Sequence, residues 1–201
     1  MTKTIINVVL TLLVIGLIYY LAMLINEPIE FQAERSKRER AVATQLMKIR
    51  TAQQAYKGIT GEYAATFDTL RHVLSTDSFQ IITVFGDADV EGSEVTRQTS
   101  YVHALDSMAT LGISLDSLDY VPYGSDTAKY KVEAAVIEYQ STEVPVVQVS
   151  IPIRDYMGPY ANAKYMKFDN SYDPNLVLKF GDMTKPSTNG SWKQFGKEEK
   201  N

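Results

Sequence analysis

The chain has 201 residues, a formal net charge of −4 and no cysteine. The missing cysteine excludes disulfides, thiolate metal sites, a thiol nucleophile and a lipid-modified cysteine anchor. The mild acidity argues against a nucleic-acid partner, because non-specific nucleic-acid binding needs a basic face.

Residues 5–25 form an almost unbroken apolar run without a charged side chain. A helix rises about 1.5 Å per residue and the hydrocarbon core of a bilayer is about 30 Å thick, so about twenty such residues span it. A cleaved signal peptide has a shorter apolar core and a small-x-small cleavage site, whereas this run ends in Leu24 and Ile25. We therefore expect a retained transmembrane anchor over residues 1–26, which contacts the lipid bilayer through residues 5–25.

The orientation of this anchor stays open at the level of sequence. Lys3 precedes the apolar run, and four cations follow it at Arg35, Lys37, Arg38 and Arg40. By the positive-inside rule these four favour a cytoplasmic domain. They begin about ten residues beyond the run and alternate with glutamates, so the charge bias is weak.

Residues 27–41 form a charged, helix-prone stretch. Pro28 lacks an amide hydrogen and its ring clashes with the preceding turn, so it should kink or restart the helix. The part from Glu34 to Arg40 is polar on every side, and pairs such as Glu34 with Arg38 support an exposed helix. We expect a solvated helical stem, and contact of its cations with anionic headgroups is the alternative.

A folded domain is predicted over residues 42–182, and it begins with an amphipathic helix. Its apolar face repeats at helical spacing and consists of Val42, Leu46, Ile49, Ala52 and Tyr56. Gly58 and Gly61 should end this helix, because glycine tolerates the left-handed cap. Thr66 is a suitable N-cap for a second helix over residues 67–74.

The remainder of the domain is predicted to be rich in strands. Apolar, β-branched and aromatic residues bounded by turn signals predict strands over 80–85, 118–121, 130–139, 144–153 and 176–180. The short polar turn between Tyr139 and Val144 predicts a hairpin. Pro145 and Pro152 cannot donate to a ladder, so an edge position or frayed ends are expected for 144–153.

Three further segments lie between or after these strands. Residues 87–100 are polar and are predicted to be a loop, and residues 101–111 are predicted to be a helix that ends at Gly112. The tail, 183–201, is rich in Pro, Ser, Asn, Gly and Lys and is expected to be mobile. The predicted fold class is α+β: a transmembrane helix continues into a long helix that packs on a C-terminal antiparallel sheet.

Two acidic loops have the oxygen-rich composition that calcium prefers. Asp87, Asp89 and Glu91 stand at alternate positions before Gly92, but Gln98 occupies the position where a calcium loop needs its bidentate glutamate. The second loop is 169–173, in which Asp and Asn are also ordinary turn formers. We expect both to be solvated loops without a metal.

Catalytic signatures are weak in this sequence. His72 and His103 are the only histidines, and a zinc site built on them would need carboxylates as well. The sequence has no Gly-x-Ser-x-Gly elbow, phosphate loop or dinucleotide fingerprint. We therefore expect no catalytic residue, no cofactor and no enzymatic activity.

The end of the long helix resembles type IV pilins and type II secretion pseudopilins through Ile49–Tyr56, Gly61–Ala64 and Phe67–Leu70. In those families a long N-terminal helix ends in a similar turn, followed by a Gly-x-Tyr element and a short segment ending in leucine. The resemblance implies a pilin-like domain in which this helix lies close on an antiparallel sheet. The chain is also similar to uncharacterised single-span membrane proteins of Bacteroidota through Asn189–Trp192.

Two functions are consistent with these patterns. The first is a non-enzymatic, pilin-like component of a pilus or secretion-type assembly, anchored once in the inner membrane with a periplasmic domain that contacts envelope proteins or itself. The second is a single-span binding module that does not polymerise. The first is the main expectation. One observation favours the second: residues 1–5 lack the glycine, and residues 5–25 the glutamate, of a prepilin peptidase site.

Overall fold

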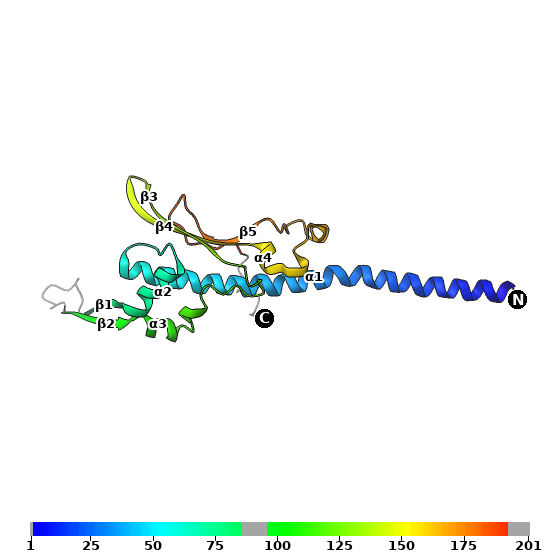
Figure 1. Ribbon diagram of the computed structural model, residues 1–201, viewed down its shortest axis with the longest axis horizontal. Coiled ribbons are helices and arrows are strands. Elements are labelled where there is room, and N and C mark those ends of the chain that lie inside the picture. The colour runs from blue at the N-terminus through cyan, green and yellow to red at the C-terminus, as the bar shows by residue number, and fades with distance from the viewer. Residues whose placement is uncertain (1, 86–95, 193–201) are drawn as a thin grey trace.

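The computed structural model describes residues 2–85 and 96–192. One helix, α1 (Thr2–Thr60), runs the length of the molecule, and the rest of the chain folds around its second half (Figure 1). A three-stranded sheet with short helices lies along one side of α1, and a layer of helices with a two-stranded sheet lies along the other. The fold class is therefore α+β, with antiparallel sheets, as predicted.

The two layers are built from short elements. One layer holds β3 (Lys131–Tyr139), β4 (Thr142–Pro152), α4 (Ile153–Met157), the 3-10 turns η2 (Gly158–Tyr160) and η3 (Ala163–Lys167), and β5 (Val177–Gly181). The other holds α2 (Phe67–Thr76), β1 (Ser78–Phe85), β2 (Thr96–His103), α3 (Ala104–Thr110) and the 3-10 turn η1 (Leu115–Ser117).

The predicted apolar face of α1 is the centre of the core. Its first four members are fully buried: Val42, Leu46, Ile49 and Ala52. Because both layers cover α1, polar side chains on its flanks are buried as well, among them Gln53. The amide of Gln53 donates to the carbonyl of Ala64 and accepts from its N–H, both at 2.9 Å. The turn after the helix therefore satisfies this buried amide.

The ends of the first two helices agree largely with prediction. Gly61 has φ +86° and its N–H donates to the carbonyl of Lys57 at 2.9 Å, so it caps α1, whereas Gly58 lies within the helix. The hydroxyl of Thr66 accepts the N–H of Thr69 at 3.2 Å, which confirms the predicted N-cap of α2.

The hairpin predicted around residues 139–144 is confirmed. Gln140 and Ser141 form its two-residue turn with φ 52° and 63°, the conformation that matches the twist of antiparallel strands. Of the two alternatives predicted for the second strand, the edge position is wrong, because β4 lies between β3 and β5. β5 pairs with Gln148–Pro152 alone, so Pro145 lies beyond the reach of β5 and Pro152 ends the strand. Each proline therefore lies where β4 pairs with one neighbouring strand only, so its missing N–H interrupts no hydrogen bonding between two neighbours.

The middle of the chain differs from prediction. Part of the expected loop and helix, from Thr96 to His103, is strand β2, because it pairs with β1 along its length. The helix α3 then starts at Ala104. The strand expected at 118–121 is absent: the described backbone there continues from η1 into turns. Leu115, Leu118 and Val121 are all buried, and their spacing of three residues suits a 3-10 turn rather than a strand.

The first part of the expected mobile tail is folded. Gly190 bridges to Phe180 of β5, and the N–H of Ser191 donates to the carbonyl of Lys179 at 2.8 Å. Trp192 packs against the core. The free edge of β5 supplies the hydrogen bonds that hold this segment, a partner that composition alone does not reveal.

Gly181, at the end of β5, should not tolerate a side chain. Its φ is +84°, and a Cβ there would lie 1.9 Å from the carbonyl oxygen of Val147. We expect Gly181→Ala to lower the free energy of unfolding by about 2–4 kcal/mol, from backbone strain and overpacking together. Gly112→Ala is the matched control, because Gly112 has φ +67° but open space around it. Thermal unfolding followed by circular dichroism measures both, and equal losses would disprove the clash.

Candidate functional site at the base of the apolar helix

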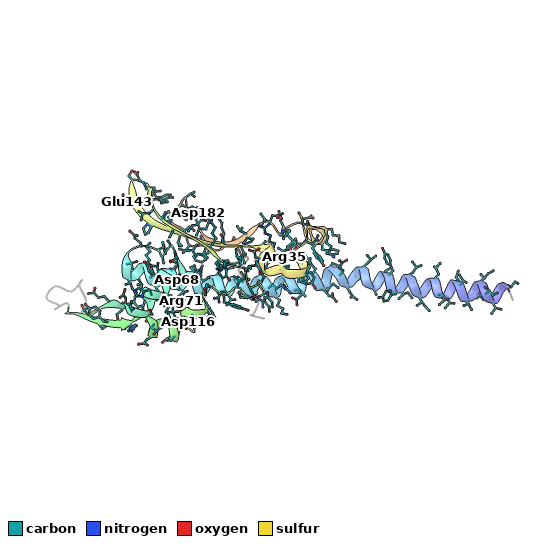
Figure 2. All side chains as sticks on the ribbon, in the orientation of Figure 1. Arg35, Asp68, Arg71, Asp116, Glu143 and Asp182 are labelled. Carbon is teal, nitrogen blue, oxygen red and sulfur yellow. The ribbon has the colours of Figure 1, made fainter. Side chains whose placement is uncertain are left out.

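The first half of α1 is an exposed apolar helix. From Ile5 to Ile25 its large apolar side chains are 47–75% exposed, and Figure 2 shows side chains projecting from this part of the helix beyond the domain. In the described part of the chain it is the one helix long and apolar enough to cross a membrane. Its exposure distinguishes it from a core helix. A signal sequence near the N-terminus can pass the same test of length and composition, and differs in being removed.

The domain begins on the helix within two turns of the apolar run. The ring of Phe31 is fully buried. It stacks on Tyr165 with centroids 4.9 Å apart and meets Tyr172 edge-on at 5.0 Å. Tyr160 and Phe168 lie at 6.1 and 6.2 Å. These five rings, called the aromatic cluster below, fasten the segment from η2 to residue 172 onto α1.

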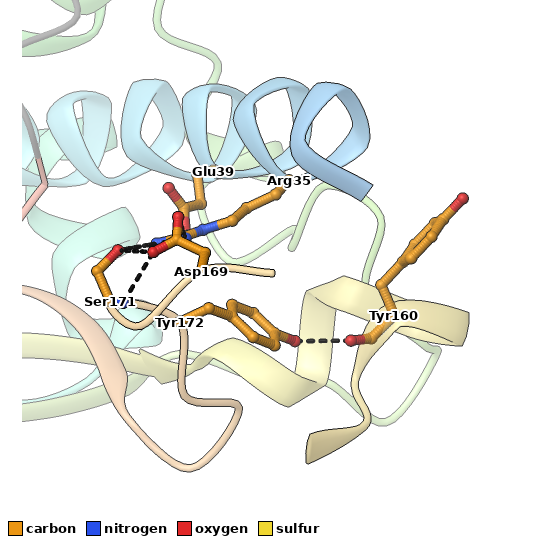
Figure 3. A network of polar contacts seen from close by, with 6 residues as sticks. All are labelled: Arg35, Glu39, Tyr160, Asp169, Ser171 and Tyr172. Carbon is orange, nitrogen blue, oxygen red and sulfur yellow. Dashed lines mark hydrogen bonds and ion pairs between the residues drawn. The ribbon is translucent and has the colours of Figure 1, made fainter. Parts of the chain in front are cut away.

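A polar network continues the attachment one turn further along α1. Arg35 contacts Asp169 at 2.5 Å and Glu39 at 2.8 Å (Figure 3). The other oxygen of Asp169 accepts the N–H and the hydroxyl of Ser171, both at 2.7 Å. The Arg35 guanidinium also lies 5.3 Å from the centre of the Tyr172 ring. The side chain of Arg35 is 13% exposed, so this network is a docking contact and not a solvated face.

Arg38 holds the end of α4 in a similar way. Its Nη1 donates to the carbonyls of Tyr156 and Met157 at 3.2 and 2.9 Å, as a cation at a helix C-terminus does. Its Nε pairs with Glu34 at 3.0 Å. Hydrogen bonds from Arg38 and then Lys37 lower the pKa of Glu34, so this carboxylate stays ionised in mild acid.

The solvated stem expected for residues 27–41 is therefore wrong, because one face of it is covered by the domain. Of the kink or restart expected at Pro28, the restart is wrong, because Pro28 lies inside the continuous helix α1. The charge pattern did not reveal that two of the arginines have partners more than one hundred residues away in the sequence. Phe31 is the apolar residue that this stretch buries.

Closest to the apolar run, η3 brings two lysines beside α1. The ammonium groups of Lys164 and Lys167 each lie 3.8 Å from a carboxylate oxygen of Glu27. They also lie over the rings of Tyr165 and Phe168 at 4.6 and 4.4 Å. Tyr165 and, to a smaller degree, Glu27 raise the pKa of Lys164, which therefore stays cationic at neutral pH.

A groove of about 770 Å³ lies on the opposite side of α1, between the helix and the segment after η1. The described residues that line it include three cations, Lys37, Arg40 and Lys48, of which Lys37 also pairs with the neighbouring Glu34 at 3.1 Å. Gln45 ties the two walls together by donating to the carbonyl of Ser117 at 2.6 Å. The groove is basic and begins about three turns beyond the apolar run, so its chemistry suits an anionic ligand.

Three buried tyrosines offer no acid–base chemistry near neutral pH. Burial raises the pKa of Tyr130 and Tyr156 well above the ordinary value, and raises that of Tyr172 to about 12. Tyr172 donates its hydroxyl to the carbonyl of Tyr160 at 2.7 Å. All three remain neutral phenols, so they pack the domain and do not act as bases.

The metal candidates within the described residues are considered one by one. The acidic positions 87–92 lie outside the described residues. Asp169 is engaged with Arg35 and Ser171 as above, and Asp173 accepts the N–H of Asn175 at 2.8 Å. His72 is exposed on α2, and His103 accepts the N–H of Leu105 at the start of α3. Among the described residues no group of three or more His, Cys, Asp or Glu side chains is arranged to hold a metal ion.

The residues that build this base were not predicted as a site. Phe31, Arg35 and Arg38 are spaced at i, i+4 and i+7, the spacing of one helix face. A lone phenylalanine on the same helix face as two arginines could have indicated that this face is covered by another part of the chain. Lys164 and Lys167 carry no such signal, because their place beside Glu27 depends on how the chain folds back from β4.

No family model, curated protein or solved structure matches this chain. The features of the described residues that bear on function are the exposed apolar helix, the contacts at its base and the groove.

Proposed function

We propose that this protein is a single-span, membrane-anchored interaction protein without enzymatic activity, which binds an acidic segment of another envelope protein in the basic groove. The anchor is the exposed apolar half of α1, retained in the membrane. The observation that carries the proposal is the groove itself: a concavity with three cations on a helix that continues directly into the apolar run.

The walls of the groove favour binding of a folded or extended protein segment. Its floor is part of α1 that is packed on the core through Leu46 and Ile49, so the cations of the groove project from a rigid support. Tyr120, which is 65% exposed, adds an aromatic ring at the rim, a residue type enriched in protein interfaces. The positive charge of these cations attracts and orients carboxylate groups, so an acidic protein segment is the expected ligand.

A pilin-like component of a pilus or secretion-type assembly is the second candidate. The observation that favours it is the continuous helix, exposed and apolar in its first half and covered by a sheet in its second. The turn with Gly61 and Tyr63 after that helix resembles the pilin turn. In this alternative the apolar halves of several copies would pack together within an assembly in the inner membrane.

Photocrosslinking in native membranes tests the proposal. A photoreactive amino acid at Thr44, which lines the groove, should give a discrete adduct with a second protein. The same amino acid at Thr142, in the β3–β4 hairpin, should not. We expect the double variant Lys37→Glu/Lys48→Glu to abolish the adduct, because it reverses two of the three lining cations. An adduct that persists in that variant, or no adduct from Thr44, would refute binding in the groove.

The pilin-like alternative and the orientation need separate readouts. A ladder of adducts at multiples of the chain mass, obtained from Leu13 in the apolar run, would favour the assembly. A membrane-impermeant maleimide decides the side, because the chain has no cysteine of its own. We expect a cysteine at Thr142 to react in intact spheroplasts, which corresponds to a periplasmic domain. Reaction only after lysis would place the domain in the cytoplasm.

A further inference from the structure

The turn η3 is the part of the folded domain that lies beside the beginning of the charged half of α1. In Figure 1 the segment around residue 165 sits at the end of the domain that faces the N-terminus. The contacts of Lys164 and Lys167 with Glu27 fix this position. Glu27 is two residues beyond Ile25, the last residue of the apolar run.

This position corresponds to the headgroup layer of a bilayer that holds residues 5–25. With a rise of about 1.5 Å per residue, the Cα of Glu27 lies about 3 Å beyond that of Ile25. Side chains of a helix point back toward its N-terminus, so the Glu27 carboxylate is directed toward the apolar run. The headgroup layer is about 5–8 Å thick on each side. The two ammonium groups beside Glu27 therefore fall within it.

The turn η3 itself presents two cations and no carboxylate to the base of α1. Two ammonium groups face the one Glu27 carboxylate, and both contacts are long at 3.8 Å. The side chains of Lys164 and Lys167 are 55% and 58% exposed. Met166 on the same turn is 40% exposed. Cations beside an exposed apolar side chain are the combination with which interfacial segments bind anionic membranes.

We propose that η3 is a lipid-binding surface, on which Lys164 and Lys167 bind the phosphate groups of anionic phospholipids. The lipids are those of the bilayer that holds α1, so this inference rests on the membrane anchoring in the proposed function. The contact fixes the height and rotation of the domain above the membrane. It places the groove, from Lys37 to Lys48, about 18–35 Å beyond the end of the apolar run.

Spin labels on single cysteines can test this contact in the full chain, because the protein has no native cysteine. The variants Met166→Cys, Leu13→Cys and Thr142→Cys are reconstituted in nanodiscs of phosphatidylcholine, with or without phosphatidylglycerol. Accessibility to oxygen and to a water-soluble nickel chelate reports the depth of each label. We expect the Leu13 label to be deep, the Thr142 label to be in water, and the Met166 label to lose nickel access when phosphatidylglycerol is present.

Removal of the lysines should reverse the effect. In the Met166→Cys protein, each of Lys164→Gln and Lys167→Gln should reduce the ratio of shielded to nickel-accessible label roughly fivefold, as expected for one cation at an anionic surface. Glu27→Gln should increase that ratio, and 0.5 M salt should weaken it by screening, as expected with a Debye length of about 4–5 Å. The control variant, Lys57→Gln with Lys131→Gln, removes two cations away from η3, one more than either single variant, and should leave the ratio unchanged.

The outcomes separate the two proposals. A deep Leu13 label together with a Met166 label as accessible as that at Thr142 would overturn lipid binding by η3 and leave the anchor intact. A Met166 label that is shielded equally with and without phosphatidylglycerol would overturn recognition of anionic lipid. A Leu13 label in water would overturn the anchoring itself.

Discussion

The double variant Leu13→Arg/Leu17→Arg should move this protein from the membrane fraction to the soluble fraction. Both side chains are exposed apolar residues in the middle of the run, at 56% exposure each. An arginine at the centre of a membrane helix costs about 2.5–3.5 kcal/mol on the biological insertion scale, so two cost about 5–7 kcal/mol. That loss is enough to reverse insertion of a single helix. Carbonate extraction of membranes followed by immunoblotting measures the distribution.

A control variant must show that arginines act by preventing membrane insertion and not by unfolding the domain. Leu111→Arg/Leu176→Arg is the matched control, because these leucines are 60% and 54% exposed on the folded domain. We expect that variant to stay in the membrane fraction and to unfold at nearly the parental temperature. Retention of the Leu13→Arg/Leu17→Arg protein in carbonate-washed membranes would disprove a membrane-spanning role for residues 5–25.

Structure could be predicted best for elements whose conformation depends on their own residues. Residues 42–52 repeat apolar side chains at helical spacing, and any layer placed on them buries the same face. The hairpin around Gln140 and Ser141 depends on a turn of two residues between alternating strands. Such local patterns need no knowledge of distant segments, which is why the helix, the hairpin and the strand before Gly181 could be predicted.

Elements that depend on distant partners could not be predicted. Tyr101–His103 joins a strand because residues 78–80 pair with it. Residues 189–192 are ordered by the edge of β5. The candidate site has the same character: the charged neighbours of Arg35 in the sequence predict a solvent-exposed side chain, whereas its partner Asp169 is 134 residues away. A single sequence contains the donors and acceptors of such contacts without their pairing.

Phe31→Ala should have the largest effect on the stability of the folded domain. The substitution removes a fully buried ring that contacts four other aromatic side chains. Large-to-small changes of this kind lower the free energy of unfolding by about 3–5 kcal/mol. For a domain of this size the melting temperature should fall by about 6–20 °C. Thermal unfolding in detergent micelles measures it. Ile29→Ala, at a residue 61% exposed two positions earlier, should change stability by less than about 0.5 kcal/mol.

Phe31→Ala also tests whether the lipid-binding surface of η3 and the basic groove depend on each other. The aromatic cluster holds η3 on one side of α1, whereas the groove is closed on the other side by Gln45 and Ser117. Below its melting temperature, Phe31→Ala should therefore release the Met166 spin label from the headgroup layer while the Thr44 crosslink persists. Loss of both readouts together would mean that the domain unfolds as one unit around α1. An unchanged Met166 label would mean that lipid contact, and not the aromatic cluster, determines where η3 lies.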